Sequence, residues 1–96
     1  MTCADVESAL RRAVEEIQVQ SGRPFESWSM QLQPIGGLEG FDSLNAEEVV
    51  VILEGALGVP LRADFFVEEG SHRALPVSDI VDRLCVVVGV EEKAQS

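Results

Sequence analysis

The sequence has few of the residues from which most enzyme active sites are built. It contains one histidine, His72, no tyrosine and no glycine-rich phosphate-binding motif. A serine hydrolase needs a base beside its nucleophile and donors for the oxyanion, which one histidine can hardly provide. His72 stands next to Arg73 in a stretch of loop composition, which favours a surface residue over a catalytic base. We therefore expect that the chain is not an enzyme.

Cysteine is also scarce, since Cys3 and Cys85 are the only two. Two cysteines so far apart in the sequence indicate neither a disulfide framework nor a metal site. The first residues lack the basic flank and apolar block of a secretory signal, and no apolar run approaches the roughly 20 residues of a membrane span. We therefore expect reduced thiols, a cytoplasmic protein and no bound metal.

Basic residues are outnumbered, with 7 Lys and Arg against 17 Asp and Glu and a net charge of −10. Nucleic acids and anionic membrane surfaces would repel such a chain, so we expect neither as a partner. Basic surfaces of other proteins are the expected partners, although acidity can also serve solubility alone. We expect a monomer.

What the sequence does contain is enough apolar residues for one small core. A chain of 96 residues buries only about 60 to 65% of its unfolded surface, so residues 1–96 are expected to form a single domain. Because aromatic residues make up 5% of the chain, the core must consist largely of Val, Leu, Ile and Ala. Such residues suit a small helical bundle or a small mixed domain.

Apolar residues at steps of three and four predict two long helices in the first two thirds of the chain. The first covers residues 3–20, where Thr2 can cap the first turn and Asp5 suits the helix dipole. The second covers residues 43–57 and ends before the glycine and proline of residues 58–60.

A third helix of about 12 residues is predicted over residues 77–88, with Pro76 in its first turn and Gly89 at its end. The run 85–88 also has strong strand propensity, which conflicts with an all-helical fold. We adopt the helix because the apolar spacing continues through this run.

Two segments connect the long helices without a sustained period. The first, residues 21–42, is predicted to be a long loop in which Ser27 to Gln33 form at most a short turn of helix. The second, residues 61–74, is predicted to be irregular, with a possible short helix over residues 64–69.

The predicted helix over residues 43–57 has two different sides when about 100° of rotation is taken per residue. One side is expected to face the core and contains Ala46, Val49, Ile52, Leu53, Ala56 and Leu57. The opposite stripe contains Ser43, Glu47 and Glu54, flanked by Leu44, Glu48 and Val51. We therefore expect one surface to present a hydroxyl, carboxylates and one or two exposed aliphatic side chains.

A serine stands at the start of this helix in Gly40-Phe41-Asp42-Ser43-Leu44, and the helix continues as Val51-Ile52-Leu53-Glu54-Gly55-Ala56-Leu57-Gly58-Val59-Pro60-Leu61. In this motif, in the register that follows it and in the order of its elements, most of the chain resembles the acyl carrier protein family. The resemblance implies an all-α four-helix bundle of the acyl-carrier type. It would have three long helices, one short irregular helix and a long first loop.

The resemblance also implies a function for Ser43. A phosphopantetheinyl transferase would attach a 4′-phosphopantetheine arm from coenzyme A to this serine, beside Asp42 and Leu44. The thiol of the arm would hold an acyl or related group as a thioester, for enzymes of fatty-acid or secondary-metabolite biosynthesis. Acyl-loading and acyl-processing enzymes would dock with basic patches on a surface formed by Glu47, Glu48, Val51 and Glu54.

Several alternatives stay open. Asp42 is assigned to helix capping and transferase recognition, but its carboxylate could equally help to hold a metal during transfer. Asn45 and Glu47 differ from the residues common in the family, which suggests a specialised carrier. The Asp42-Ser43 pair could instead only cap a helix, in an unmodified acidic adaptor that binds a protein partner. A further hypothesis is a core cavity for the acyl chain, lined by Val49, Leu53, Leu57, Ile80 and Leu84.

Overall fold

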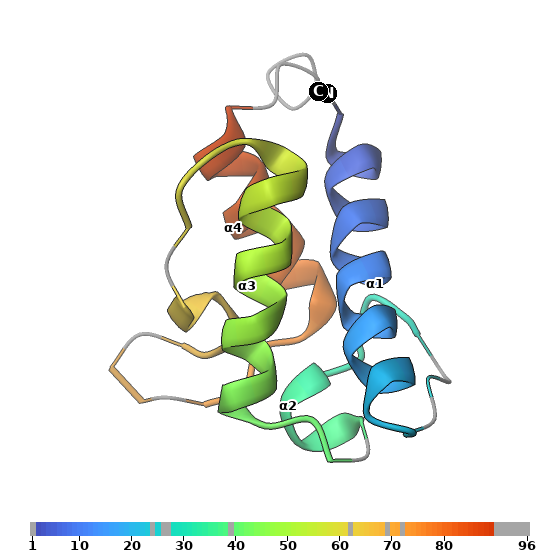
Figure 1. The fold of residues 1–96 in the computed structure, drawn as a ribbon. Coiled ribbons are helices and arrows are strands. Elements are labelled where there is room, and N and C mark those ends of the chain that lie inside the picture. The colour runs from blue at the N-terminus through green and yellow to red at the C-terminus, as the bar shows by residue number, and fades with distance from the viewer. Residues whose placement is uncertain are drawn as a thin grey trace.

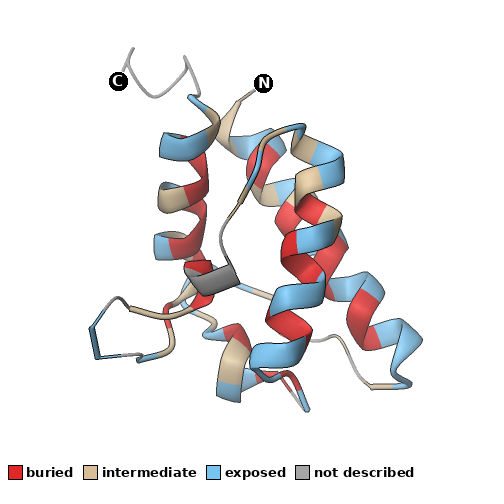
Figure 2. Ribbon diagram, turned by 60° about the vertical axis from the view of Figure 1, so that its left-hand side comes forward, coloured by how far each residue is buried: buried red, intermediate tan, exposed pale blue. Residues whose placement is uncertain are grey.

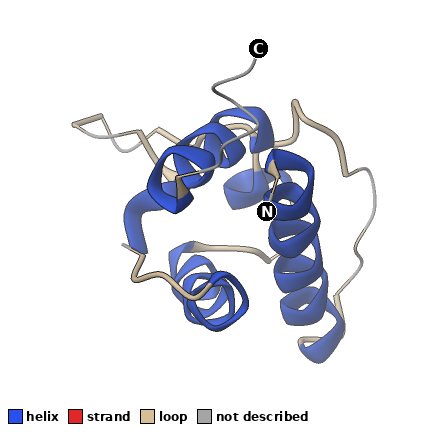
Figure 3. Cartoon of the chain, turned by 90° about the horizontal axis from the view of Figure 1, so that it is seen from above, coloured by secondary structure: helices blue, strands red, loops and turns tan. Residues whose placement is uncertain are grey.

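The computed structural model describes residues 2–23, 25, 28–38, 40–61, 63–68, 70–71 and 73–89. Its helices are α1 (Cys3–Gln20), α2 (Pro34–Gly37), α3 (Ser43–Leu57) and α4 (Val77–Val88), and a 3₁₀ helix, η1 (Ala63–Phe66), lies between α3 and α4 (Figure 1). The described residues contain no strand, apart from one isolated antiparallel bridge between Val67 and Ala74 (Figure 3). The protein is therefore all-α, as predicted.

Helix α1 begins and ends at the predicted residues. Thr2 Oγ1 accepts a hydrogen bond from the Asp5 backbone N–H (3.1 Å), and Asp5 Oδ2 accepts one from the Thr2 N–H (2.9 Å). This reciprocal pair is a capping box, which satisfies backbone donors that have no partner inside the helix. The backbone N–H of Thr2 is the main reason why the pKa of Asp5 lies below its usual value.

Helix α1 packs against both α3 and α4, and η1 packs against α3 and α4 (Figure 1). The buried residues lie mainly on the sides of the helices that face one another (Figure 2). Residues 85–88 belong to α4 despite their strand propensity. Cys85 continues the buried face that the helical period gives α4, whereas Val86 and Val87 are exposed. Within the described residues, no helix is both long enough and apolar enough to cross a membrane.

The bounds of α3 agree with the prediction, but its predicted core face is partly wrong. Its buried residues are Asn45, Ala46, Val49, Val50 and Leu53. Ala56 is exposed, and Ile52 and Leu57 are only half-buried. The helix is apolar nearly all round between Val49 and Leu53, so the sequence pattern alone could not fix which side faces α1.

The connections between the long helices are irregular, but their short helical pieces lie elsewhere than predicted. The first connection has no helix over the described residues 28–33, and Ser27 lies outside the described part. Its helical piece is α2, which begins at Pro34 and is interrupted by Gly36 with a φ of 90°. Proline favours the first position of a helix because its φ is already fixed. In the second connection, η1 begins and ends earlier than the predicted helix over residues 64–69, and Glu69 is not described.

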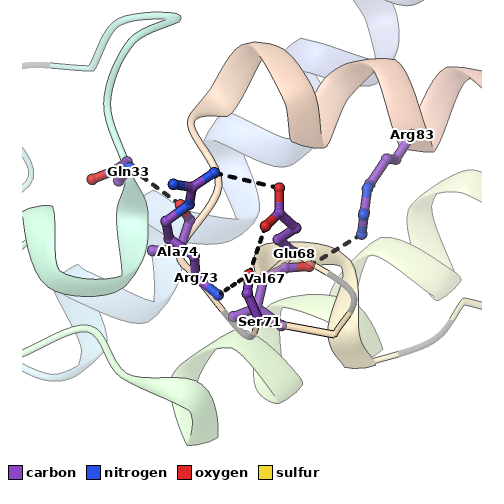
Figure 4. A network of polar contacts seen from close by, with 7 residues as sticks. All are labelled: Gln33, Val67, Glu68, Ser71, Arg73, Ala74 and Arg83. Atoms are coloured by element: carbon purple, nitrogen blue, oxygen red, sulfur yellow. Dashed lines mark hydrogen bonds and ion pairs between the residues drawn. The ribbon is translucent and has the colours of Figure 1, made fainter.

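The loop that follows η1 is tied to its surroundings at both ends (Figure 4). Arg83 Nη1 of α4 donates to the carbonyl of Val67 (3.2 Å), and Gln33 Nε2 donates to the carbonyl of Ala74 (3.1 Å). Since these two carbonyls flank the loop, its ends are attached both to α4 and to the loop between α1 and α3.

Polar contacts within this loop are centred on Glu68 (Figure 4). Its carboxylate accepts hydrogen bonds from Ser71 Oγ (2.6 Å) and Arg73 Nη2 (3.5 Å). The Ser71 hydroxyl, and then the charge of Arg73, keep the pKa of Glu68 below its usual value. The ion pair is exposed and is therefore expected to add little stability. His72, predicted to lie at the surface, is outside the described residues.

The expectation of two reduced thiols is wrong in this structure. Cys3 in the first turn of α1 and Cys85 in α4 form a disulfide, with their Cα atoms 5.8 Å apart. This Cα separation lies in the usual range for disulfides. The pairing was hidden in the sequence because 82 positions separate two residues that the packing of α1 against α4 brings together.

Candidate functional site

Ser43 is the first residue of α3, and its side chain is exposed. Asp42 is the N-cap residue, and its Oδ1 accepts hydrogen bonds from the backbone N–H groups of Leu44 (3.0 Å) and Asn45 (3.1 Å). The predicted capping role of Asp42 is thereby confirmed. The serine therefore lies on regular helical backbone at a capped helix start, with its side chain exposed.

Asn45 completes this cap, which the sequence analysis did not anticipate. Its Oδ1 accepts a hydrogen bond from the Asp42 N–H (3.2 Å), and its Nδ2 donates to Glu48 Oε1 (3.0 Å). The side chain is 8% exposed, which is unusual for asparagine. The spacing of Asp42 and Asn45 is that of a capping box, so this role had a signal in the sequence.

The segment before Ser43 is held by a buried side chain, that of Phe41, and by a hydrogen bond to its backbone at Gly40. Phe41 is buried, and its ring packs against Phe66 of η1 with the ring centroids 5.7 Å apart. Gly40 has a φ of +69°, which favours glycine, and its carbonyl accepts a hydrogen bond from Arg23 Nη1. The same Arg23 nitrogen donates to Asn45 Oδ1 (3.2 Å). Arg23 had no signal in the sequence, because only the fold brings it to this turn.

An open surface pocket with a volume of about 560 Å³ lies beside the start of α3. It is lined by Arg23, Asp42, Leu44, Asn45, Glu47, Glu48 and Val51. The fold therefore brings together five of the residues that the sequence analysis assigned to the site. Ser43 and Glu54 are not among the lining residues, although Ser43 lies between Asp42 and Leu44 on the same helical turn.

Apolar and acidic groups share this surface. The side chains of Leu44 and Val51 are 68% and 66% exposed, and Glu47 and Glu48 are exposed as well. The predicted exposure of these two aliphatic residues is confirmed. A surface of this kind combines apolar area, which favours contact with another apolar surface, and negative charge, which selects a basic one.

Glu54 has a different environment from the other carboxylates of the predicted docking surface. It is half-buried, and its Oε2 accepts a hydrogen bond from the backbone N–H of Leu61 (2.8 Å). The side chain thereby holds the chain that leaves α3 after Gly58, whose φ of 72° ends the helix. Its contact with Leu61 therefore gives Glu54 a structural role in this fold.

No family model, no curated protein and no solved structure matches this chain. The acyl-carrier resemblance therefore depends on the sequence of the chain and on the arrangement of its residues around Ser43. Among the described residues, no group of three or more His, Cys, Asp or Glu side chains is arranged to hold a metal ion.

Proposed function

We propose that this protein is a carrier that holds an acyl or related group on a 4′-phosphopantetheine arm attached to Ser43. The observation that carries the proposal is an exposed serine hydroxyl on the first residue of a 15-residue helix whose start is fixed by a capping box. In the transfer, Ser43 Oγ would attack the phosphorus of coenzyme A that bears the pantetheine. A phosphodiester would form, the hydroxyl proton would pass to a base of the transferase, and the nucleotide half of coenzyme A would leave.

The start of a helix is a favourable place for the anionic phosphodiester, because the helix dipole attracts negative charge. Asp42 opposes this attraction by its own charge. Its carboxylate is engaged by the backbone N–H groups of Leu44 and Asn45, which supports a capping role for Asp42 rather than phosphate binding.

Partner enzymes would dock on the surface formed by Leu44, Glu47, Glu48 and Val51. The two aliphatic side chains would contact an apolar patch of the partner, and the carboxylates would attract its basic rim.

We expect the Glu47→Gln/Glu48→Gln variant to raise the KM of a phosphopantetheinyl transferase for the carrier, and the effect to shrink as salt rises. The matched control is Glu15→Gln/Glu16→Gln, which removes the same charge from the exposed side of α1. Equal effects of both variants would leave the docking surface without support.

The test of the carrier proposal is the intact mass of the protein after incubation with coenzyme A and a phosphopantetheinyl transferase. We expect the mass to rise by one phosphopantetheine in the wild type and in Ser8→Ala, which alters an exposed serine of α1, but not in Ser43→Ala. An unchanged mass with several transferases would favour the unmodified acidic adaptor, which binds a protein partner through the same surface. Hydrolytic turnover by the protein alone would point to an enzyme instead.

A further inference from the structure

Arg23 is a cation that the fold, rather than the sequence motif, brings to the candidate site. Its backbone N–H donates to the carbonyl of Gln18 (2.8 Å) just after α1 ends, which fixes where the side chain starts. The side chain is half-buried and lines the pocket beside α3. From this position its guanidinium reaches the backbone that leads into α3.

The contacts of Arg23 connect the two turns on either side of Ser43. Nη1 donates to the carbonyl of Gly40, which precedes the serine, and to Oδ1 of Asn45, which follows it. A Cβ atom at Gly40 would lie 2.7 Å from Arg23 Cδ, so the arginine stem lies directly against the glycine backbone. Asn45 Oδ1 also accepts the Asp42 N–H, so the same oxygen connects the guanidinium of Arg23 to the N-cap residue.

We propose that Arg23 is a positioning residue for the modification of Ser43, an inference that rests on the proposed function. The segment that Arg23 holds is rich in glycine, with Gly36, Gly37 and Gly40 in seven residues before Asp42, and glycine leaves backbone the most conformational freedom. Arg23 limits this freedom on both sides of Ser43, through its hydrogen bonds to Gly40 and Asn45. A transferase then meets an acceptor hydroxyl on an ordered turn, and it does not have to order the turn during the reaction.

The test compares the kinetics of transfer to Arg23→Met, Arg23→Lys and the wild type, with a transferase that modifies the wild type and with initial rates taken from intact mass. Methionine keeps much of the apolar stem and removes the donors. We expect its kcat to fall about tenfold, as for the loss of a charged hydrogen bond, while KM changes by no more than about twofold. Arg23→Lys should lie in between, because its ammonium is shorter and lacks the guanidinium fork. Arg12→Met, which removes the same charge from the exposed side of α1, should behave as the wild type.

Amide hydrogen exchange provides the readout of local order. In Arg23→Met, exchange should accelerate at Gly40 to Asn45 and stay unchanged in the middle of α1. Wild-type kcat in Arg23→Met, or unchanged exchange in this segment, would overturn the inference. So would a change in KM alone that Arg23→Lys restores in full, because it would assign Arg23 to charge attraction. Should Arg23→Met not fold, Arg23→Lys carries the same prediction in smaller measure. Absence of transfer to the wild type would overturn the proposed function, and this inference with it.

Discussion

Helices α1 and α3 both start with a capping box, and the two starts lie at opposite ends of the molecule (Figure 1). The box at the start of α1 consists of the half-buried Thr2 and the exposed Asp5, whose side chains bond each other's backbone. The box at the start of α3, Asp42 with Asn45, is also bonded to Arg23, which lies 22 positions away from Asn45. The first cap is local, whereas the second is part of the tertiary structure.

The two ends also differ in what holds them to the rest of the fold. Beside the α1 cap, the disulfide between Cys3 and Cys85 joins α1 to α4. Beside the α3 cap there is no covalent cross-link. The buried ring of Phe41 packs against η1, and the guanidinium of Arg23 binds the Gly40 carbonyl. The side-chain contacts that order the start of α3 leave Ser43 exposed, as the proposed modification by another protein requires.

The largest effect on stability is expected from the disulfide between Cys3 and Cys85. Reduction with dithiothreitol should lower the free energy of unfolding by about 4 kcal/mol, because the unfolded chain regains the entropy of a loop of more than 80 residues. The comparison of denaturant curves with and without the reductant measures this. The Cys3→Ala/Cys85→Ala variant is the control and should not respond to it. Superimposable curves for the wild type would show that no such disulfide stabilises the protein.

The next effect separates the two caps. Asp42→Ala should cost about 2 kcal/mol of stability and Thr2→Ala about 1 kcal/mol, because the loss of Asp42 also disturbs the buried Asn45. Denaturant unfolding measures both, with Asp42→Asn and Thr2→Ser as variants that keep a capping oxygen. Only Asp42→Ala should also slow transfer to Ser43. If the two alanine variants lost the same stability and were modified equally fast, the contacts of the α3 cap with the rest of the fold would add nothing to it.

The smallest effect concerns pH at the α1 cap. The pKa of Asp5 is lowered in the folded protein, chiefly by the Thr2 backbone N–H. The ionised carboxylate therefore stabilises the fold at pH values above 3.8, the ordinary pKa of this group. This stability is lost as pH falls from 3.8 through the folded pKa. The melting-temperature difference between the wild type and Asp5→Asn should therefore shrink below pH 3.8. A constant difference down to pH 2 would contradict the contribution of this carboxylate.

The sequence was sufficient for the long helices and for the serine at the start of one of them. Thr2 and Asp42 cap the starts of helices, and Gly58 and Gly89 lie at helix ends. Because these residue types favour such positions, the bounds of the helices could be predicted. The core side of α3 could not, because Val49 to Leu53 are all apolar and give no phase. Val50 is buried and Ala56 is exposed, which only the packing against α1 and η1 decides.

The contacts between distant segments could not be predicted either. Arg23 and the disulfide partners depend on how α1, α3 and α4 are placed, and nothing in their own surroundings in the sequence marks them. The candidate surface was predictable to the extent that it lies on one helix. Leu44, Glu47, Glu48 and Val51 follow from helical spacing, whereas the engagement of Glu54 by Leu61 depends on the path of the chain after α3.

The most direct test of the carrier proposal is to locate the added group. The protein would be produced together with a phosphopantetheinyl transferase, cleaved into peptides and fragmented in a mass spectrometer. We predict one phosphopantetheine per chain, carried by Ser43 and by none of the other serines. A chain that stays unmodified under these conditions, or that carries the group on another residue, would contradict the account.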